Sequence, residues 1–259
     1  MKARHLMVPG LSMEAATRCG LNDTATRVAR MVSSFPATLA AQQATLLTGS
    51  PPSEHGVLFA EDTSRLPALI EPWHAIDDSL LRGGSIEAVK LSILDAAESV
   101  DVLLVSGCPI GEAVDRIVHP AVSAPDGFRI TVEDVFVLCE PTDPDRALPQ
   151  LVIDEWLRIP GIERVLAPAA ESAGAWMAPS DRGWILVAER GWSFRKTAEA
   201  VGRTDGTDPT LLAFGRPWPA AWPTSVHDWR VAPTLLELLG RDGSGCFDAP
   251  LNGAGRLGS

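Results

Sequence analysis

The sequence has no tyrosine and only five histidines among its 259 residues. Few of its side chains can therefore act as general acids or bases near neutral pH. Any metal-dependent hydrolysis would have to draw its ligands from this small set of histidines and from the carboxylates.

Paired cysteines and long apolar runs are also missing. The four cysteines are widely spaced and form no CxxC pair, so a zinc ribbon is disfavoured and reduced thiols are expected. No run approaches the roughly 20 apolar residues of a membrane span. The apolar stretch before Gly10 is too short for a secretory signal. These features predict a soluble, cytoplasmic protein that does not act at a membrane.

Positive charge is scarce as well. Lys and Arg total 22 against 33 Asp and Glu, which gives a formal net charge of −11. This balance argues against a nucleic-acid backbone or an anionic membrane as the main partner. The 46% of hydrophobic residues and 21% of charged residues are typical of a globular chain.

What is present is an alternation of strand-like and helix-like segments. Strands are predicted at residues 6–11, 100–105, 131–138, 162–166, 184–189 and 211–214. Helices are predicted at residues 22–31, 40–47, 85–99, 151–157 and 229–239. The alternation predicts an α/β fold, a three-layer sandwich with a largely parallel central sheet flanked by helices. We expect one domain over residues 1–242, with a flexible Gly-rich tail over residues 243–259.

One segment carries the most recognisable motif of the chain. A Phe-Pro break precedes a predicted helix, which closes with Thr-Gly, a proline-containing turn and His-Gly. This order resembles the type I phosphodiesterase/nucleotide pyrophosphatase branch of the alkaline phosphatase superfamily. Weaker similarities follow at residues 161–166, 185–194, 206–209 and 228–240. The motif residues are Phe35, Pro36, Thr48, Gly49, His55 and Gly56.

The resemblance implies a metal-dependent hydrolase of phosphoric esters, but key positions depart from the family pattern. Pro9 stands where the family has a metal-binding aspartate, and Leu39 stands at the position of the nucleophile. Gln42 corresponds to the amide that helps to hold the phosphoryl oxygens. Thr38 is a weak substitute nucleophile, because one position along a helix turns a side chain by about 100°.

The remaining metal ligands of the family are also missing. The family's Asp-His pair corresponds to Cys139-Glu140, and Gly202 or a neighbour stands where a later histidine is expected. Glu140, Asp143 and Asp205 are weak candidates for a displaced site, although residues 141–145 also read as an ordinary capped turn. In the family, the histidine that His55 matches belongs to a structural turn.

These departures predict a pseudoenzyme, a non-catalytic scaffold that binds a ligand or a protein and needs no cofactor. Residues that act as a unit in catalysis are strongly non-additive, so losing both a metal ligand and the nucleophile is severe. The alternative is an active metal-dependent phosphodiesterase or phosphatase that holds zinc or another divalent cation with displaced ligands.

Two further groups of residues are candidates for a binding role. Trp218 and Trp222 lie in a Pro/Trp-rich segment, residues 216–223, which either covers a bare sheet edge or serves a protein partner or a homo-oligomer. Arg190, Arg195 and Lys196 form the strongest basic cluster and are a candidate anion site.

Overall fold

The structure is a computed structural model, and it describes 13 stretches of the chain, to which all structural statements refer. These are residues 1–35, 37–59, 62, 74–80, 82–108, 116–118, 122–167, 183–189, 191–195, 209–215, 218, 222–246 and 250–251. No helix in these stretches is both long enough and apolar enough to cross a bilayer.

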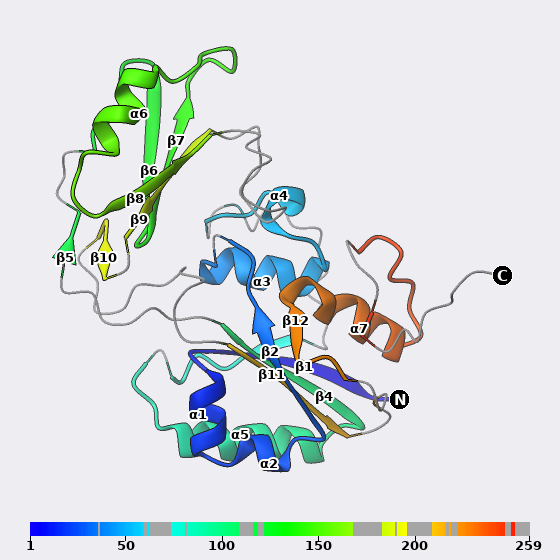
Figure 1. Cartoon of the computed structure of the whole chain (residues 1–259). Helices are drawn as coiled ribbons and strands as arrows, with labels where there is room; N and C mark the ends of the chain where they lie inside the picture. The colour runs from blue at the N-terminus through cyan, green and yellow to red at the C-terminus, as the bar shows by residue number, and fades with distance from the viewer. Residues whose placement is uncertain are drawn as a thin grey trace.

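A six-stranded sheet forms the centre of the molecule (Figure 1). Its strands are β1 (Ala3–Pro9), β2 (Arg27–Val32), β3 (His74–Ile76), β4 (Val102–Cys108), β11 (Thr210–Gly215) and β12 (Ser225–His227). They lie in the order β12-β2-β11-β4-β1-β3. Strand β1 runs parallel to β3 and β4, and β12 runs parallel to β2, while β11 is antiparallel to both of its neighbours. The largely parallel central sheet expected from the sequence is thus confirmed.

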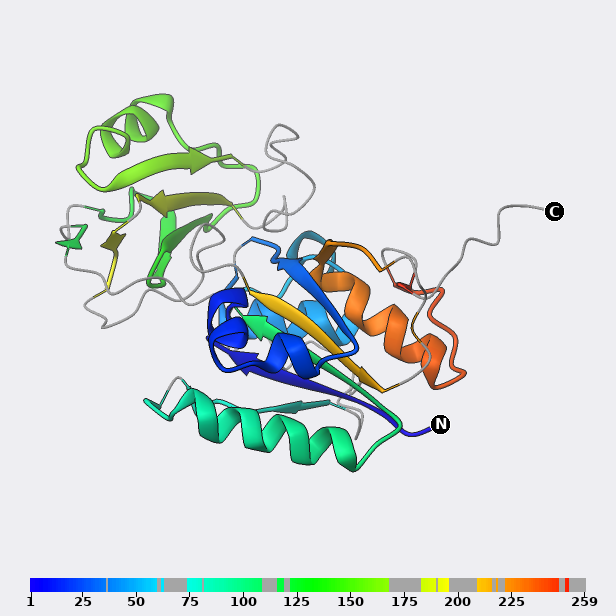
Figure 2. The same ribbon diagram turned by 60° about the horizontal axis from the view of Figure 1, so that its bottom comes forward.

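Helices cover both faces of this sheet and complete three layers. Helices α3 (Leu39–Thr48) and α7 (Val231–Leu238) cover one face, where Met7 and Leu104 pack in the same apolar cluster as Leu235. Helices α1 (Met13–Arg18), α2 (Leu21–Thr24) and α5 (Ile86–Glu98) cover the other face. Figure 2 shows α5 and α7 on opposite sides of the sheet. Successive residues of β1 point to opposite faces, so each strand serves both layers.

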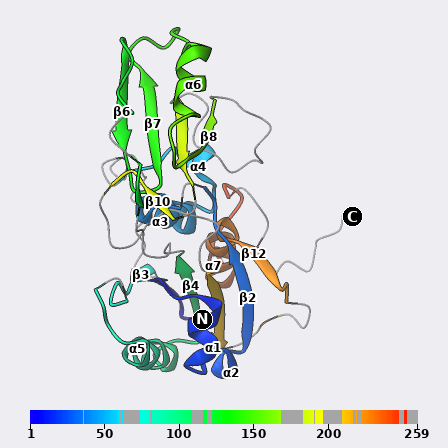
Figure 3. The same cartoon turned by 60° about the vertical axis from the view of Figure 1, so that its left-hand side comes forward.

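A second, four-stranded antiparallel sheet lies beside the first (Figure 3). It contains β6 (Phe128–Val132), β7 (Phe136–Pro141), β8 (Ile162–Leu166) and β9 (Trp184–Ala188), in the order β6-β7-β9-β8. Helix α6 (Gln150–Trp156) packs on one of its faces. On the other face, the rings of Phe35 and Phe59 meet that of Phe136, with centroids 6.4 and 5.7 Å apart. These rings join the second sheet to the segments around α3.

Four short elements complete the described structure. Helix α4 (Pro52–His55) follows α3, and the 3-10 turn η3 (Asp228–Arg230) leads into α7. Strands β5 (Arg116–Ile117) and β10 (Trp192–Ser193) form a separate parallel pair.

The structure corrects two predicted elements. The helix expected at residues 22–31 is wrong beyond Thr24, because residues 27–32 form β2, in which Ala29 and Met31 are buried and Arg30 is exposed. This alternation is the period of a strand. The single strand expected at residues 131–138 is also wrong. The chain turns after β6 and returns antiparallel as β7, with Glu133 N–H donating to Phe136 O at 2.9 Å.

The other predicted elements are confirmed, with the bounds given above. The division of the chain at residue 242 stays a prediction. Most of the tail, residues 247–249 and 252–259, lies outside the described residues.

Candidate functional site

The N-terminal turn of α3 carries the positions at which the family resemblance places the nucleophile. Thr38 is the N-cap of this helix: its Oγ1 accepts from Ala41 N–H at 3.1 Å and donates to Leu58 O at 2.8 Å. Leu39 begins the helix and packs against the apolar cluster beneath α3 and α7. The Thr38 hydroxyl therefore serves as the helix cap, and Leu39 beside it presents only methyl groups.

The carboxyl ends of β1 and β4 lie next to each other at the edge of the sheet where ligands bind in open α/β folds. Pro9 is paired in register with Cys108, and Gly10 N–H donates to Cys108 O at 3.0 Å. Burial, together with the charge of Asp228, raises the pKa of the Cys108 thiol, so the sulfur stays protonated. Pro9 has no side-chain ligand atom, and a metal ion at Cys108 would have to displace a proton that burial holds on the sulfur.

A buried carboxylate, Asp228, lies at the start of η3 and collects four hydrogen bonds. Its Oδ2 accepts from Ser34 N–H at 2.7 Å, from Ser34 Oγ at 2.8 Å and from Gln42 Nε2 at 2.5 Å. Its Oδ1 accepts from Trp229 N–H at 2.9 Å. Gln42, the expected phosphoryl-binding amide, thus donates to a carboxylate of its own chain.

The protonation of Asp228 reflects two opposing influences. Burial raises the pKa of its carboxyl to about 6, and the hydrogen bonds from Ser34, Gln42 and Trp229 act in the opposite direction. Donors that favour the charged form offset part of the cost of burying it. At neutral pH the group is therefore mostly ionised.

A chain of hydrogen bonds links Asp228 to His55. Val57 N–H donates to His55 Nδ1 at 3.0 Å, so in the neutral ring the proton resides on Nε2. Burial lowers the pKa of His55 to about 4, which keeps the ring neutral. His55 Nε2 lies 3.0 Å from Thr45 Oγ1, and Thr45 Oγ1 lies 3.3 Å from Ser34 Oγ.

The proton on His55 Nε2 sets the direction of each hydrogen bond from His55 to the Asp228 carboxylate. His55 Nε2 donates to Thr45, Thr45 donates to Ser34, and Ser34 donates to Asp228. We call these residues, together with Gln42, the Asp228 network. It ties the segment after β2 to α3, to the turn of α4 and to η3. Its members are Ser34, Gln42, Thr45, His55 and Asp228.

Gln42 and His55 were singled out in the sequence, whereas Asp228, Ser34 and Thr45 were not. One signal for Asp228 does exist in the sequence, namely a lone acidic residue directly before an apolar helix. Ser34 and Thr45 carry no comparable signal.

The candidates for a displaced metal site lie elsewhere. Strand β7 points away from the six-stranded sheet (Figures 1 and 3). Near its end Glu140 binds Arg129 at 2.8 Å across the hairpin. Asp143 follows the strand, and its Oδ1 accepts from Asp145 N–H at 3.2 Å. Asp205 lies outside the described residues.

Within the described residues, the side chains at the ends of β1 and β4 therefore do not fit a resident divalent metal. Pro9 has no ligand atom, and the Cys108 thiol is protonated. Within the described stretches, no three His, Cys, Asp or Glu side chains are grouped to hold an ion.

The other motif residues occupy turns and packing positions. Gly49 ends α3 with φ 69°, and Gly56 ends α4 with φ 72°. Thr48 Oγ1 donates to Ala44 O at 2.8 Å. Phe35 packs against the second sheet, as described above, and Pro36 lies outside the described residues.

The two groups with a candidate binding role are placed only in part. The rings of Trp218 and Trp222 meet edge to face, 5.1 Å apart, and pack against the core on the α3 and α7 side. Arg195 Nη1 lies 3.3 Å from Glu133 Oε2 in a half-exposed pair. Arg190 and Lys196 lie outside the described residues.

This arrangement of two sheets with flanking helices is shared by several solved structures. The chain is similar to the solved structure of murine ectonucleotide pyrophosphatase/phosphodiesterase 5, with a TM-score of 0.68 and 10% identity, over 96% of this chain and 97% of that chain. An inactive form of the same murine protein in complex with AMP matches with a TM-score of 0.68 and 10% identity, over 96% of both chains.

A bacterial structure matches as well. Phosphonoacetate hydrolase from Sinorhizobium meliloti 1021, in complex with phosphonoacetate, has a TM-score of 0.60 and 12% identity, over 90% of this chain and 94% of that chain. No protein-family model and no curated protein sequence matches the chain. At these identities the likeness concerns the fold.

Proposed function

We propose that the chain is a non-catalytic member of the type I phosphodiesterase/nucleotide pyrophosphatase family and serves as a scaffold for a ligand or a protein. The observation that carries this proposal is the first turn of α3. Leu39 holds the position of the nucleophile, Thr38 caps the helix, and the Gln42 amide donates to Asp228. The positions from which the family attacks and binds a phosphoryl group are thus occupied by side chains that serve the fold.

The proposal includes the absence of a resident metal, and a metal-content measurement tests this part. The protein is dialysed against zinc or manganese, then against buffer, and the bound metal is measured by mass spectrometry. We expect far less than one ion per chain, whereas phosphonoacetate hydrolase, carried through the same steps, reports whether metal survives the protocol. Stoichiometric metal that is lost in Glu140→Gln or Asp143→Asn would support the alternative, an active hydrolase with displaced ligands.

For the ligand, we propose a phosphate-bearing anion at the basic cluster around Arg195. A solved structure of similar fold holds AMP, and Arg195 is half-exposed and pairs with Glu133. Phosphate or AMP should raise the melting temperature, and Arg195→Ala should abolish the increase. Arg129→Ala, which also breaks an Arg–Glu pair in this part of the chain, is the matched control. An unchanged increase in Arg195→Ala would refute the site.

For a macromolecular partner, we propose the segment 216–223 as the contact surface. Tryptophan is enriched at interface hot spots, and the Trp218 and Trp222 rings are only partly buried. Light scattering after size exclusion distinguishes a homo-oligomer from a monomer, and Trp222→Ala should weaken any oligomer. A monomer whose stability is unchanged by Trp222→Ala would contradict this role. The four cysteines are free thiols, which supports the proposed cytoplasmic location.

A further inference from the structure

Strand β3 forms one edge of the six-stranded sheet and is only three residues long. Among the described strands it pairs with β1 alone, with His74 directly opposite His5. A backbone hydrogen bond closes its carboxyl end, from Asp77 N–H to Met7 O at 2.9 Å. So short an edge strand has few backbone hydrogen bonds to hold it, and its side chains carry much of its attachment.

Two histidine rings and a serine join β3 to the sheet interior. His5 Nδ1 lies 2.8 Å from His74 Nδ1, and His5 Nε2 lies 2.8 Å from Ser106 Oγ. The three side chains come from β3, β1 and β4, which are neighbouring strands. His5 and Ser106 are fully buried, and His74 is partly buried.

The number of protons on this pair decides whether its bond exists. A hydrogen bond between two ring nitrogens needs one N–H and one lone pair. The neutral pair satisfies this condition, and so does a pair with one added proton, in which one ring donates from Nδ1 and the other keeps its Nδ1 lone pair. A second added proton places N–H groups on both Nδ1 atoms, which removes the acceptor and sets two cations face to face.

We propose that the His5–His74 pair is an acid-released latch that holds strand β3 on the edge of the sheet. With up to one added proton the latch is closed, and with two it opens and leaves the edge of β1 unpaired. The device requires no ligand and acts on this edge of the fold alone.

Among the described residues of the neighbouring elements, few titratable side chains face the pair. On β1, Arg4 is exposed and points to the opposite face, and the described residues of α3 carry no titratable side chain. Strand β4 contributes the neutral Ser106 and the protonated thiol of Cys108. On the α7 side, Glu237 is the one titratable side chain of the helix.

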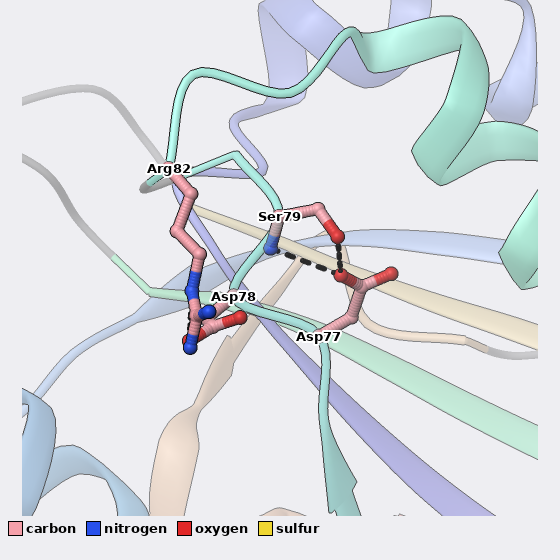
Figure 4. A network of polar contacts seen from close by, with 4 residues as sticks. All are labelled: Asp77, Asp78, Ser79 and Arg82. Atoms are coloured by element: carbon pink, nitrogen blue, oxygen red, sulfur yellow. Dashed lines mark hydrogen bonds and ion pairs between the residues drawn. The ribbon is translucent and has the colours of Figure 1, made fainter.

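The carboxylates that follow β3 are bound in their own turn (Figure 4). Asp77 Oδ1 accepts from both the backbone N–H and the hydroxyl of Ser79. Asp78 Oδ2 pairs with Arg82 at 2.7 Å. Both carboxylates thus have partners other than the histidines.

The latch is closed at neutral pH. Burial lowers the pKa of His74 to about 4, and burial together with the charge of His74 lowers the pKa of His5. Protons therefore enter the closed pair only in acid, whereas a released His74 ring takes up its proton at the ordinary pKa of 6.5. The stability that the pair gives to β3 is therefore full above about pH 6.5 and is lost progressively as the pH falls toward about 4.

Hydrogen exchange of single amides, followed by NMR and corrected for the intrinsic rate, tests the latch in the whole protein. In the wild type, protection of the Asp77 amide should fall at least about tenfold between neutral pH and about pH 4, while amides of β4 keep theirs. In His74→Asn the fall should vanish, because an amide side chain can donate or accept and so stays bonded when His5 is protonated. His227→Asn, on the edge strand β12, is the matched control and should keep the fall.

The proposal is overturned if protection of the Asp77 amide is unchanged in acid, if β4 loses protection in parallel, or if His74→Asn shows the same fall. Should His74→Asn not fold, histidine ring NMR of the wild type decides. A shared Nδ1 proton that is present at neutral pH and lost in acid supports the latch, and one that persists in acid contradicts it.

Discussion

At the scale of single residues, Asp228 shows how a buried charge can be accommodated without a ligand. Four donors from Ser34, Gln42 and Trp229 surround a carboxylate that has no exposed surface. Removing a partner from a buried charge costs far more than the net worth of the contact. The network therefore fixes the positions of β2, α3 and η3 relative to each other.

The network contains two groups whose stability contributions change with pH in opposite directions. For His55 the folded pKa is about 4 against 6.5 unfolded, so its contribution is full above about pH 6.5 and is lost as the pH falls to about 4. For Asp228 the folded pKa is about 6 against 3.8 unfolded, so its contribution is full below about pH 3.8 and is lost as the pH rises to about 6. Either change amounts to about 3 kcal/mol, at about 1.4 kcal/mol for each unit of pKa.

Two variants separate these contributions. Between about pH 4.5 and 6.5, Asp228→Asn should gain more stability than the wild type, and His55→Gln should gain less. Urea denaturation at the two pH values measures the difference, and all other titrating groups are common to the three proteins. Shifts of both variants in the same direction would contradict the assigned pKa directions.

Two glycines with similar φ values distinguish the stability cost of backbone strain from that of a steric contact. Gly49 and Gly240 have φ values of 69° and 68°, but a Cβ on Gly49 would lie 2.7 Å from Cys246 Sγ, whereas nothing lies near one on Gly240. Both alanine variants should lose about 1–2 kcal/mol from the left-handed backbone, and Gly49→Ala should lose about 1 kcal/mol more from the contact.

Thermal unfolding of the two glycine variants measures this difference. Adding Cys246→Ala to Gly49→Ala should recover part of the loss, because the nearest atom is removed. Equal losses for Gly49→Ala and Gly240→Ala would show that the turn does not pack as described.

Some site residues could be predicted from the sequence because they belong to a spaced motif. Gln42 and His55 were found in this way, and both lie in the Asp228 network. Asp228 could not be predicted from the sequence, because it is separated from Ser34 by 194 positions and no local pattern pairs the two residues. Such a contact is created by the fold, which brings the end of β2 to the start of η3.

At the scale of elements, β2 shows that the local sequence pattern is not always sufficient to predict secondary structure. Asn22 and Asp23 give a helix start, and a four-residue helix does form there. From Arg27 the chain instead fills the gap between β12 and β11, and pairing with both strands outweighs local preference.

The strand assignment of residues 27–32 predicts unequal effects at adjacent positions. Met31 is buried in the core, and Arg30 is exposed. Met31→Ala should cost about 2–4 kcal/mol, and Arg30→Ala less than about 1 kcal/mol. Chemical denaturation measures both, and comparable losses would contradict the alternation.

At the scale of the whole molecule, the layer architecture could be predicted from the sequence, but the second sheet could not. Alternating helices and apolar strands dictate helices on both faces of a sheet. Local pattern does not say that residues 128–132 and 136–141 leave the central sheet, since strand partners are chosen over long distances. The likeness to hydrolases of this architecture therefore describes the scaffold, while the chemistry depends on single side chains.

The central claim is that this chain keeps the scaffold without the family's chemistry. Turnover of a p-nitrophenyl phosphodiester, with zinc or manganese supplied and a family phosphodiesterase as positive control, tests it most directly. The account predicts no release of p-nitrophenol above the buffer rate. Release that depends on added metal and is abolished by Thr38→Ala or Glu140→Gln would contradict it.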